Sequence, residues 1–201
     1  MKNKPFFFDS LDQIEQEVIR KLSRGYLDKK SPFRYLVFAT AKNDYVNSRI
    51  MVLRFFSYEN WELFVHSDKR SEKLDEIKTN NKVSINFWDK KQNFQIRLFG
   101  EASKFNFENK KVWNNLSAWS KRTYLTNSKP GSISQRHTSG FDEKFFDSPP
   151  SPEESKKGQK NFCQIKVKIK KLDVLILNRM GYRRALFEVE NKKLRKKWLI
   201  P

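Results

Sequence analysis

Between residues 34 and 105 the chain is a succession of strand-like runs separated by short turns, and this pattern favours a mainly β fold. The runs are rich in Val, Leu, Ile and aromatic residues, which suit a pleated, half-buried surface. The first three runs are expected to form a meander. The predicted strands are residues 34–41, 45–56, 61–67, 83–88 and 94–105, with turns at Asn43-Asp44 and Glu59-Asn60.

Helices are expected at the periphery of these strands. Ser10 followed by Gln13 has the form of a capping box, and apolar residues then recur near the helical period, which predicts a helix from about Ser10 to Arg24. Ser71 opens a second, short helix that would cross the mouth of the barrel, with Leu74 and Ile77 on one face. The aromatic and apolar spacing of residues 106–124 favours a third helix.

The C-terminal third begins with a polar stretch that is punctuated by Pro and Gly. Residues 128–158 cannot bury much and are expected to form a long loop or a partly ordered lid. Strand patterns return at residues 162–170, 173–177, 184–189 and 197–200, so we expect C-terminal strands to close the barrel. The 201 residues favour a single domain over 1–201, with an N-terminal helix within 1–30, the loop at 128–158 and closing strands in 159–201.

The formal net charge of +19 raises the question of a polyanionic partner. Lys and Arg are spread over the whole chain with only modest concentrations near each other, which indicates a solvated surface and makes nucleic acid an unlikely partner. The single Cys163 cannot form an internal disulfide, and no run approaches the length of a membrane span. A cytoplasmic location without membrane attachment is therefore expected.

Three phrases of the sequence carry candidate binding groups beside strand-like runs. They are residues 48–54, 66–73 and 95–100. Arg49, Arg70, Ser71 and Lys73 are suited to a terminal phosphate, and Ser71 lies near a helix N-terminus where backbone N–H groups favour an anion. The strand from Arg49 to Arg54, including Met51, Val52 and Leu53, can line a planar ring, and the amide of Gln95 can address the edge of that ring. Each piece alone is weak, since a cationic helix start is more often simply solvated.

In order and spacing these phrases resemble the pyridoxamine 5'-phosphate oxidase-like family of FMN-binding split barrels. The family pattern R-x-V-L-L-K corresponds to residues 49–54, its S-R-K to residues 71–73, and its R-Q-V-x-V-x-G to residues 94–100. Residues 173–201 are similar to the closing strands of the family. The resemblance implies an FMN-binding split β-barrel, a homodimer with FMN at its interface, and FMN contacts from Arg49, Ser67, Lys73, Gln95 and Arg184. His66, beside Ser67, is expected to contact the cofactor rather than to act as a catalyst.

The chain also departs from the family pattern. Glu72 stands where the family has a phosphate-binding Arg, and Arg70 is expected to replace that cation. Met180 and Tyr182 stand where the oxidases hold the vitamin substrate with Arg and His, so FMN binding carries over better than the vitamin substrate. The prediction is an FMN-dependent oxidoreductase of unknown small-molecule substrate, with no catalytic residue and no metal assigned. A non-enzymatic flavin carrier or sensor is the alternative, and a basic RNA-binding barrel is a weaker one.

Overall fold

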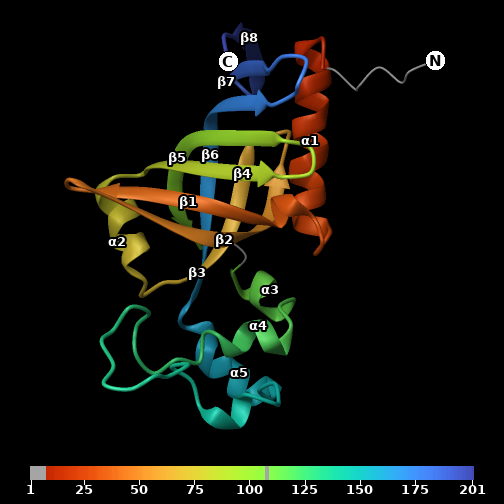
Figure 1. Cartoon of the computed structure of the whole chain (residues 1–201). Helices are drawn as coiled ribbons and strands as arrows, with labels where there is room; N and C mark the ends of the chain where they lie inside the picture. The colour runs from red at the N-terminus through yellow and green to blue at the C-terminus, as the bar shows by residue number, and fades with distance from the viewer. Residues whose placement is uncertain (1–7, 107–108) are drawn as a thin grey trace.

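The computed structural model describes residues 8–106 and 109–201, and its centre is a closed antiparallel barrel of six strands in the order β3-β2-β1-β4-β5-β6. Pairing between β3 and β6 closes the barrel, while β7 and β8 extend the sheet beyond β6. The expected mainly β fold with peripheral helices is confirmed (Figure 1). The strands are β1 (Tyr35–Lys42), β2 (Tyr45–Ser57), β3 (Glu62–Asp68), β4 (Lys82–Asp89), β5 (Phe94–Phe105), β6 (Phe162–Ile176), β7 (Arg183–Glu190) and β8 (Lys193–Leu199).

Strand β6 replaces two strands that the sequence pattern predicted separately at 162–170 and 173–177. It pairs with β5 along its length, with β3 through its first half and with β7 through its second half. The pairing of β5 with β6 shifts register between Phe99 and Gly100, and β6 bends at this point. A Cβ on Gly100 would lie 2.5 Å from the carbonyl oxygen of Lys168. The bend turns Lys170 and Lys171 outward, which interrupts the alternation in the sequence without ending the strand.

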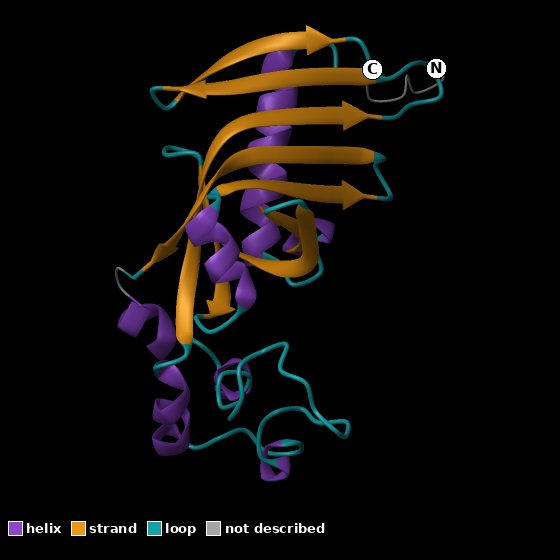
Figure 2. Cartoon of the chain, turned by 90° about the vertical axis from the view of Figure 1, so that its left-hand side faces the viewer, coloured by secondary structure: helices purple, strands orange, loops and turns teal. Residues whose placement is uncertain are grey.

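Helix α1 (Leu11–Leu27) begins where it was predicted, with the Ser10 hydroxyl accepting from the N–H of Gln13 at 3.1 Å. It runs across the strands on one side of the barrel (Figure 2) and buries Ile14, Val18 and Leu22 against the core. The prediction that it would end near Gly25 was wrong. A Cβ at Gly25 would lie 2.6 Å from the carbonyl oxygen of Phe33, so this glycine serves a close packing contact inside the helix.

The segment between β5 and β6, residues 106–161, forms an insertion below the barrel in Figure 1. Instead of one helix over 106–124 it contains α3 (Asn109–Asn114) and α4 (Ala118–Arg122), because Ser117 caps a new helix start; residues 107–108 of that prediction lie outside the described residues. The expected long loop also contains α5 (Pro152–Gln159) and a 3-10 turn at Glu143–Phe145. Ser151 and Glu154 form a capping box at the start of α5. The prediction of a loop was based on the Pro and Gly residues of this segment and did not use the capping box.

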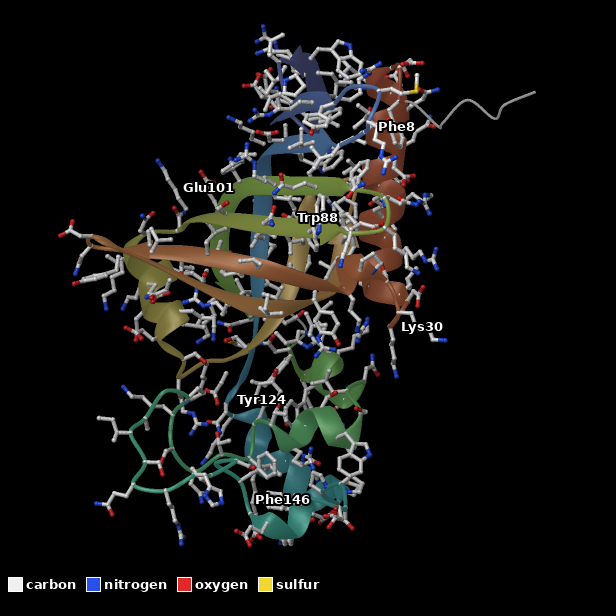
Figure 3. All side chains as sticks on the ribbon, in the orientation of Figure 1. Phe8, Lys30, Trp88, Glu101, Tyr124 and Phe146 are labelled. Atoms are coloured by element: carbon white, nitrogen blue, oxygen red, sulfur yellow. The ribbon has the colours of Figure 1, made fainter. Side chains whose placement is uncertain are left out.

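A small apolar cluster of Trp113, Tyr124 and Phe162 joins the insertion to the first residue of β6. In Figure 3 Tyr124 lies where the insertion meets the barrel, whereas Phe146 lies at the far end of the insertion. The packing therefore places one aromatic side chain of the insertion at the barrel wall. Over the described part of the chain, no helix combines the length and the hydropathy that a membrane crossing requires.

Candidate functional site

A cavity of about 250 Å³ lies against β2 at the point where β3, α2 (Glu72–Thr79) and the insertion converge. It brings together six of the twelve residues that sequence analysis assigned to cofactor binding. It also contains two residues, Ile50 and Tyr124, that sequence analysis had not selected. The lining residues are Arg49, Ile50, Met51, Val52, Arg54, His66, Lys73 and Tyr124.

Strand β2 determines how its residues meet this cavity. Met51 and Leu53 are buried in the barrel core, whereas Val52 and Arg54, on the other face of the strand, are only half-buried. The pairing of β2 with β3 shifts register between Leu53 and Phe55, so Arg54 lies at a β-bulge. A bulge redirects the side chain at its position, which explains why Arg54 borders two neighbouring cavities.

Arg49 is held by a buried carboxylate of α2. Its Nη2 donates to Oε2 of Glu76 at 3.0 Å, and its Nη1 contacts the hydroxyl of Thr40 and the carbonyl oxygen of Asn47. Glu76 is 1% exposed and also accepts from Thr40 and from the Asn47 amide, the latter at 2.6 Å. Burial opposes the charge of Glu76, but these hydrogen bonds outweigh it and lower the pKa of the carboxyl group. The pair fixes the guanidinium at the edge of the cavity.

Lys73 supplies a second cation to the cavity. Its ammonium group donates to the hydroxyl of Ser67 at 3.3 Å, and within the described residues no carboxylate forms an ion pair with it. Burial and the neighbouring charge of Arg49 lower the pKa of Lys73. Both effects penalise an isolated ammonium, so an anion bound between Arg49 and Lys73 would relieve them.

The N-terminus of α2 lies beside Lys73. Ser71 is its buried N-cap, and the Ser71 side chain makes no capping hydrogen bond, which leaves the hydroxyl available to a ligand. Glu72, which the sequence placed where the family has a cation, is exposed and does not line the cavity. The expected conflict between Glu72 and a phosphate is therefore absent from this geometry.

Arg70 lies elsewhere than sequence analysis placed it. Its guanidinium makes two hydrogen bonds to the carboxylate of Asp68, at 3.0 and 2.7 Å, and others to the carbonyl oxygen and hydroxyl of Thr126. The hydrogen bond with Asp68 raises the pKa of Arg70. Arg70 thus anchors the insertion to the end of β3, and it does not line the cavity with Arg49 and Lys73.

Gln95 and Arg184 are also remote from this cavity within one chain. Gln95 on β5 donates to Asn86 at 3.0 Å, and Arg184 on β7 donates to Asp173 at 3.1 and 2.9 Å. Along the sheet β5 lies three strand spacings from β2, and the closure through β3 and β6 places β7 three spacings from β2 as well, which is about 14 Å at 4.8 Å each. Neither side chain can reach the cavity of its own chain by such a path.

Two buried polar atoms beside the cavity have no hydrogen-bond partner, Nε of Arg54 and Nδ1 of His66. Burial and the charge of Arg54 lower the pKa of His66 to about 3, so its imidazole is neutral near pH 7. Burial raises the pKa of Tyr124, whose phenol therefore stays protonated. These groups offer hydrogen bonds to a ligand, and none of the three titrates near neutral pH.

Two functional residues escaped sequence analysis for different reasons. Glu76 follows Lys73 by three positions in α2, a spacing that puts both on one helix face and could have revealed it. Tyr124 comes from an insertion whose packing against the barrel has no local sequence signal. For metal binding, the described ranges contain no group of three or more His, Cys, Asp and Glu residues suited to an ion.

Comparisons with known proteins identify the domain that carries this cavity. Residues 13–105 match the model of the family described as "Pyridoxamine 5'-phosphate oxidase, FMN-binding domain". A search of curated proteins finds no match. Among solved structures, an FMN-binding, pyridoxamine 5'-phosphate oxidase-related protein of Nostoc punctiforme has a TM-score of 0.72 at 20% identity, over 92% of this chain and 97% of its own.

A second similar structure is PhzG of Burkholderia lata, solved in complex with tetrahydrophenazine-1-carboxylic acid. It has a TM-score of 0.72 at 14% identity and covers 98% of both chains. At these identities the structures establish the split-barrel fold, and the family match establishes FMN as the cofactor of this domain. The cavity fits that cofactor, because Lys73 has no acidic partner in the described structure and the unpaired atoms of Arg54 and His66 lie beside it.

The pairing of Arg49 with Glu76 generates a first prediction. We expect Glu76→Gln to lower the free energy of unfolding of the apoprotein by about 1.5–3 kcal/mol, since a charged hydrogen-bond partner of Arg49, Thr40 and Asn47 is lost. The pKa of Glu76 is lower in the folded chain than in the unfolded one, so its contribution is present above the unfolded pKa of about 4.3. It is lost as the pH falls through the folded pKa, and the difference between variant and parent should shrink there.

Urea denaturation at pH 7 and at lower pH measures this effect. Glu72→Gln is the matched control, because Glu72 lies on the same helix but is exposed, and its change should stay within about 0.5 kcal/mol. Equal stabilities of the two variants at pH 7 would contradict the role of Glu76.

Proposed function

Because residues 13–105 match the FMN-binding domain of the pyridoxamine 5'-phosphate oxidase family, we propose that this chain is an FMN-dependent oxidoreductase of that family that acts on a small molecule. The observation that carries this proposal is the cavity beside β2, where the Lys73 ammonium, without an acidic partner among the described residues, lies near Arg49. FMN supplies the hydride-transfer chemistry when bound. We also propose a cytoplasmic location, since the only cysteine, Cys163, is buried and unpaired.

Different residues of this chain would bind the phosphate and the ring of the cofactor. Arg49, Lys73 and the hydroxyls of Ser67 and Ser71 would hold the terminal phosphate at the N-terminus of α2. The β2 segment that includes Val52 would lie against the ring. Arg54 and His66 would donate or accept hydrogen bonds at its edge.

A flavin carrier or sensor is the second candidate. One observation favours it: His66 is neutral at pH 7 and Tyr124 stays protonated, so neither of these two side chains is poised for proton transfer near neutrality. An enzyme of this kind would depend on the cofactor alone for its chemistry. Reduction of the bound flavin by a substrate, followed by turnover, separates the two candidates.

The phosphate clamp predicts that FMN binds more tightly than riboflavin. Loss of one charged phosphate contact costs about 1.5–3 kcal/mol, so Lys73→Ala should weaken FMN about ten-fold or more and leave riboflavin nearly unchanged. Glu72→Ala should not weaken FMN, because Glu72 is exposed outside the cavity. Calorimetric titration of each apoprotein measures these affinities, and riboflavin binding as tightly as FMN would overturn the clamp.

We further propose a C2 homodimer in which each cavity is completed by the partner. Tyr35, Ile50 and Trp88 are large, exposed apolar side chains on neighbouring strands β1, β2 and β4 (Trp88 is labelled in Figure 3). A second copy would cover them and would bring Gln95 and Arg184, which are remote from the cavity of their own chain, toward the partner's cofactor, with Arg184 held in place by Asp173.

Trp88→Glu tests this assembly, because it places a charge on the exposed apolar face without touching the cavity. We expect a mass near one chain by light scattering at micromolar concentration, together with weaker FMN binding. Trp119→Glu is the matched control, since Trp119 is similarly exposed but lies in the insertion. A parent protein that is monomeric with FMN bound would exclude the homodimer.

For the reaction, we expect turnover of pyridoxine 5'-phosphate and pyridoxamine 5'-phosphate to be weak or absent, although the bound flavin should be reducible. Met180 and Tyr182 provide no positive charge where the oxidases have Arg and His, and each lost charged contact costs about 1.5–3 kcal/mol. Incubation of FMN-loaded protein with each vitamer in air, followed by an assay of pyridoxal 5'-phosphate, measures this. Turnover at the rate of a dedicated oxidase would contradict it.

A further inference from the structure

A second cavity, of about 590 Å³, lies next to the proposed flavin site. It is on the outer face of β2 and β3 beyond the bulge at Arg54, between the end of α1 and the insertion, and it shares only Arg54 and His66 with the first cavity. A molecule in this cavity would therefore lie beside a flavin in the first one. Its lining residues are Tyr26, Arg34, Leu53, Arg54, Phe55, Phe64, His66, Phe105, Val112, Asn115, Leu116 and Gln164.

Four aromatic side chains, Tyr26, Phe55, Phe64 and Phe105, line this cavity. Phe64 contacts Phe55 and Phe105 with ring centroids 5.8 and 5.3 Å apart, and Tyr26 contacts Phe55 at 5.3 Å. Leu116 of the insertion adds aliphatic surface to the wall. The volume lies within the range of small-molecule sites, and such walls favour a planar aromatic body.

The charge in the cavity is not compensated by the protein. Arg49, Arg70, Arg97 and Arg184 each form an ion pair with a carboxylate. Arg54 is half-buried and forms none with the described residues, and its Nε is buried without an acceptor. None of the residues that line the cavity is Asp or Glu. A buried guanidinium without an anionic partner costs free energy, and an anion bound in the cavity would reduce that cost.

The polar groups of the two cavities differ. Two guanidinium groups, those of Arg34 and Arg54, supply the positive charge of the second cavity. His66 is a neutral imidazole with an unpaired Nδ1, and the Gln164 amide is already bonded to Asn109 at 3.0 Å. The first cavity, in contrast, has the Lys73 ammonium beside the Ser67 hydroxyl and the N-terminus of α2, a combination that suits a phosphate. A planar guanidinium matches a planar carboxylate through two parallel hydrogen bonds.

We propose that this second cavity binds a planar aromatic carboxylate, with its carboxylate on Arg54 and its rings against the wall formed by Phe55, Phe64 and Phe105. The inference rests on the proposed function, in which such a ligand is the electron-transfer partner of the flavin next to it. Recognition of the ligand belongs to Arg54 and the aromatic wall. It does not require the phosphate clamp of Arg49 and Lys73.

Calorimetric titration with 2-naphthoate tests the ligand class, with 2-naphthamide as its neutral isostere and 2-naphthyl phosphate as the phosphate arm. We expect 2-naphthoate to bind at least about ten-fold more tightly than 2-naphthamide, since a charge-assisted contact is gained, and more tightly than 2-naphthyl phosphate. Equal binding of 2-naphthoate and 2-naphthamide would overturn the role of charge. Tighter binding of 2-naphthyl phosphate would overturn the carboxylate assignment.

Two variants locate the binding site. Arg54→Gln should weaken 2-naphthoate about ten-fold or more and leave 2-naphthamide nearly unchanged. Asn115→Asp adds a carboxylate at an exposed position that lines only the second cavity, so it should weaken 2-naphthoate several-fold while Asn115→Ala does not. Unchanged 2-naphthoate binding in Asn115→Asp and Arg54→Gln would overturn the proposal.

FMN affinity, measured in parallel on the same proteins, separates this inference from the proposed function. Asn115→Asp should leave FMN binding unchanged, and Lys73→Ala should weaken FMN without weakening 2-naphthoate binding to the apoprotein. Absence of FMN binding to the parent protein would refute the flavoprotein assignment alone. FMN binding without selective 2-naphthoate binding would refute the second cavity alone.

Discussion

The pairing of β6 with three partners is the constraint on which the rest of this structure depends. Through β3 it closes the six-stranded barrel, through β5 it continues the sheet, and through β7 it carries the C-terminal strands. Closure aligns the end of β3 with the start of β6, so His66 and Ser67 lie opposite Gln164 and Cys163. The insertion, which ends where β6 begins, is thereby held against the cavity.

Some cations of the barrel wall are paired with a carboxylate of the protein, and others are left to bind a ligand. Arg70 and Arg184 are occupied by Asp68 and Asp173, and Arg49 is held by the buried Glu76. Arg54 and Lys73 have no carboxylate partner in the part of the chain that the structure describes. The two available cations border adjoining cavities, and this arrangement suits a phosphorylated cofactor beside a second anionic ligand.

Sequence patterns predicted the elements whose signals are local. The start of α1 at Ser10, the strands around Asn43-Asp44 and the helix after Ser71 follow from capping residues, alternation and turn chemistry. The prediction was wrong at three places. Close backbone packing keeps Gly25 inside a helix, and β6 continues through a bend instead of ending. A capping box starts α5 in a segment whose Pro and Gly residues had predicted a loop. The first two depend on what the segment packs against, whereas the capping box of Ser151 and Glu154 is a local signal that the prediction of a loop did not use.

The sequence by itself determined the fold class and the family resemblance, and it predicted a set of candidate phosphate-binding residues, because residue type and spacing are sufficient for these. Only the tertiary structure decided which cations are free. Arg70 and Lys73 are three positions apart and equally cationic in sequence, yet Asp68 and Thr126 occupy the first while the second faces a cavity. Asp68 is local to Arg70, but Thr126 is 56 residues away, and no local pattern encodes the distance between those two segments.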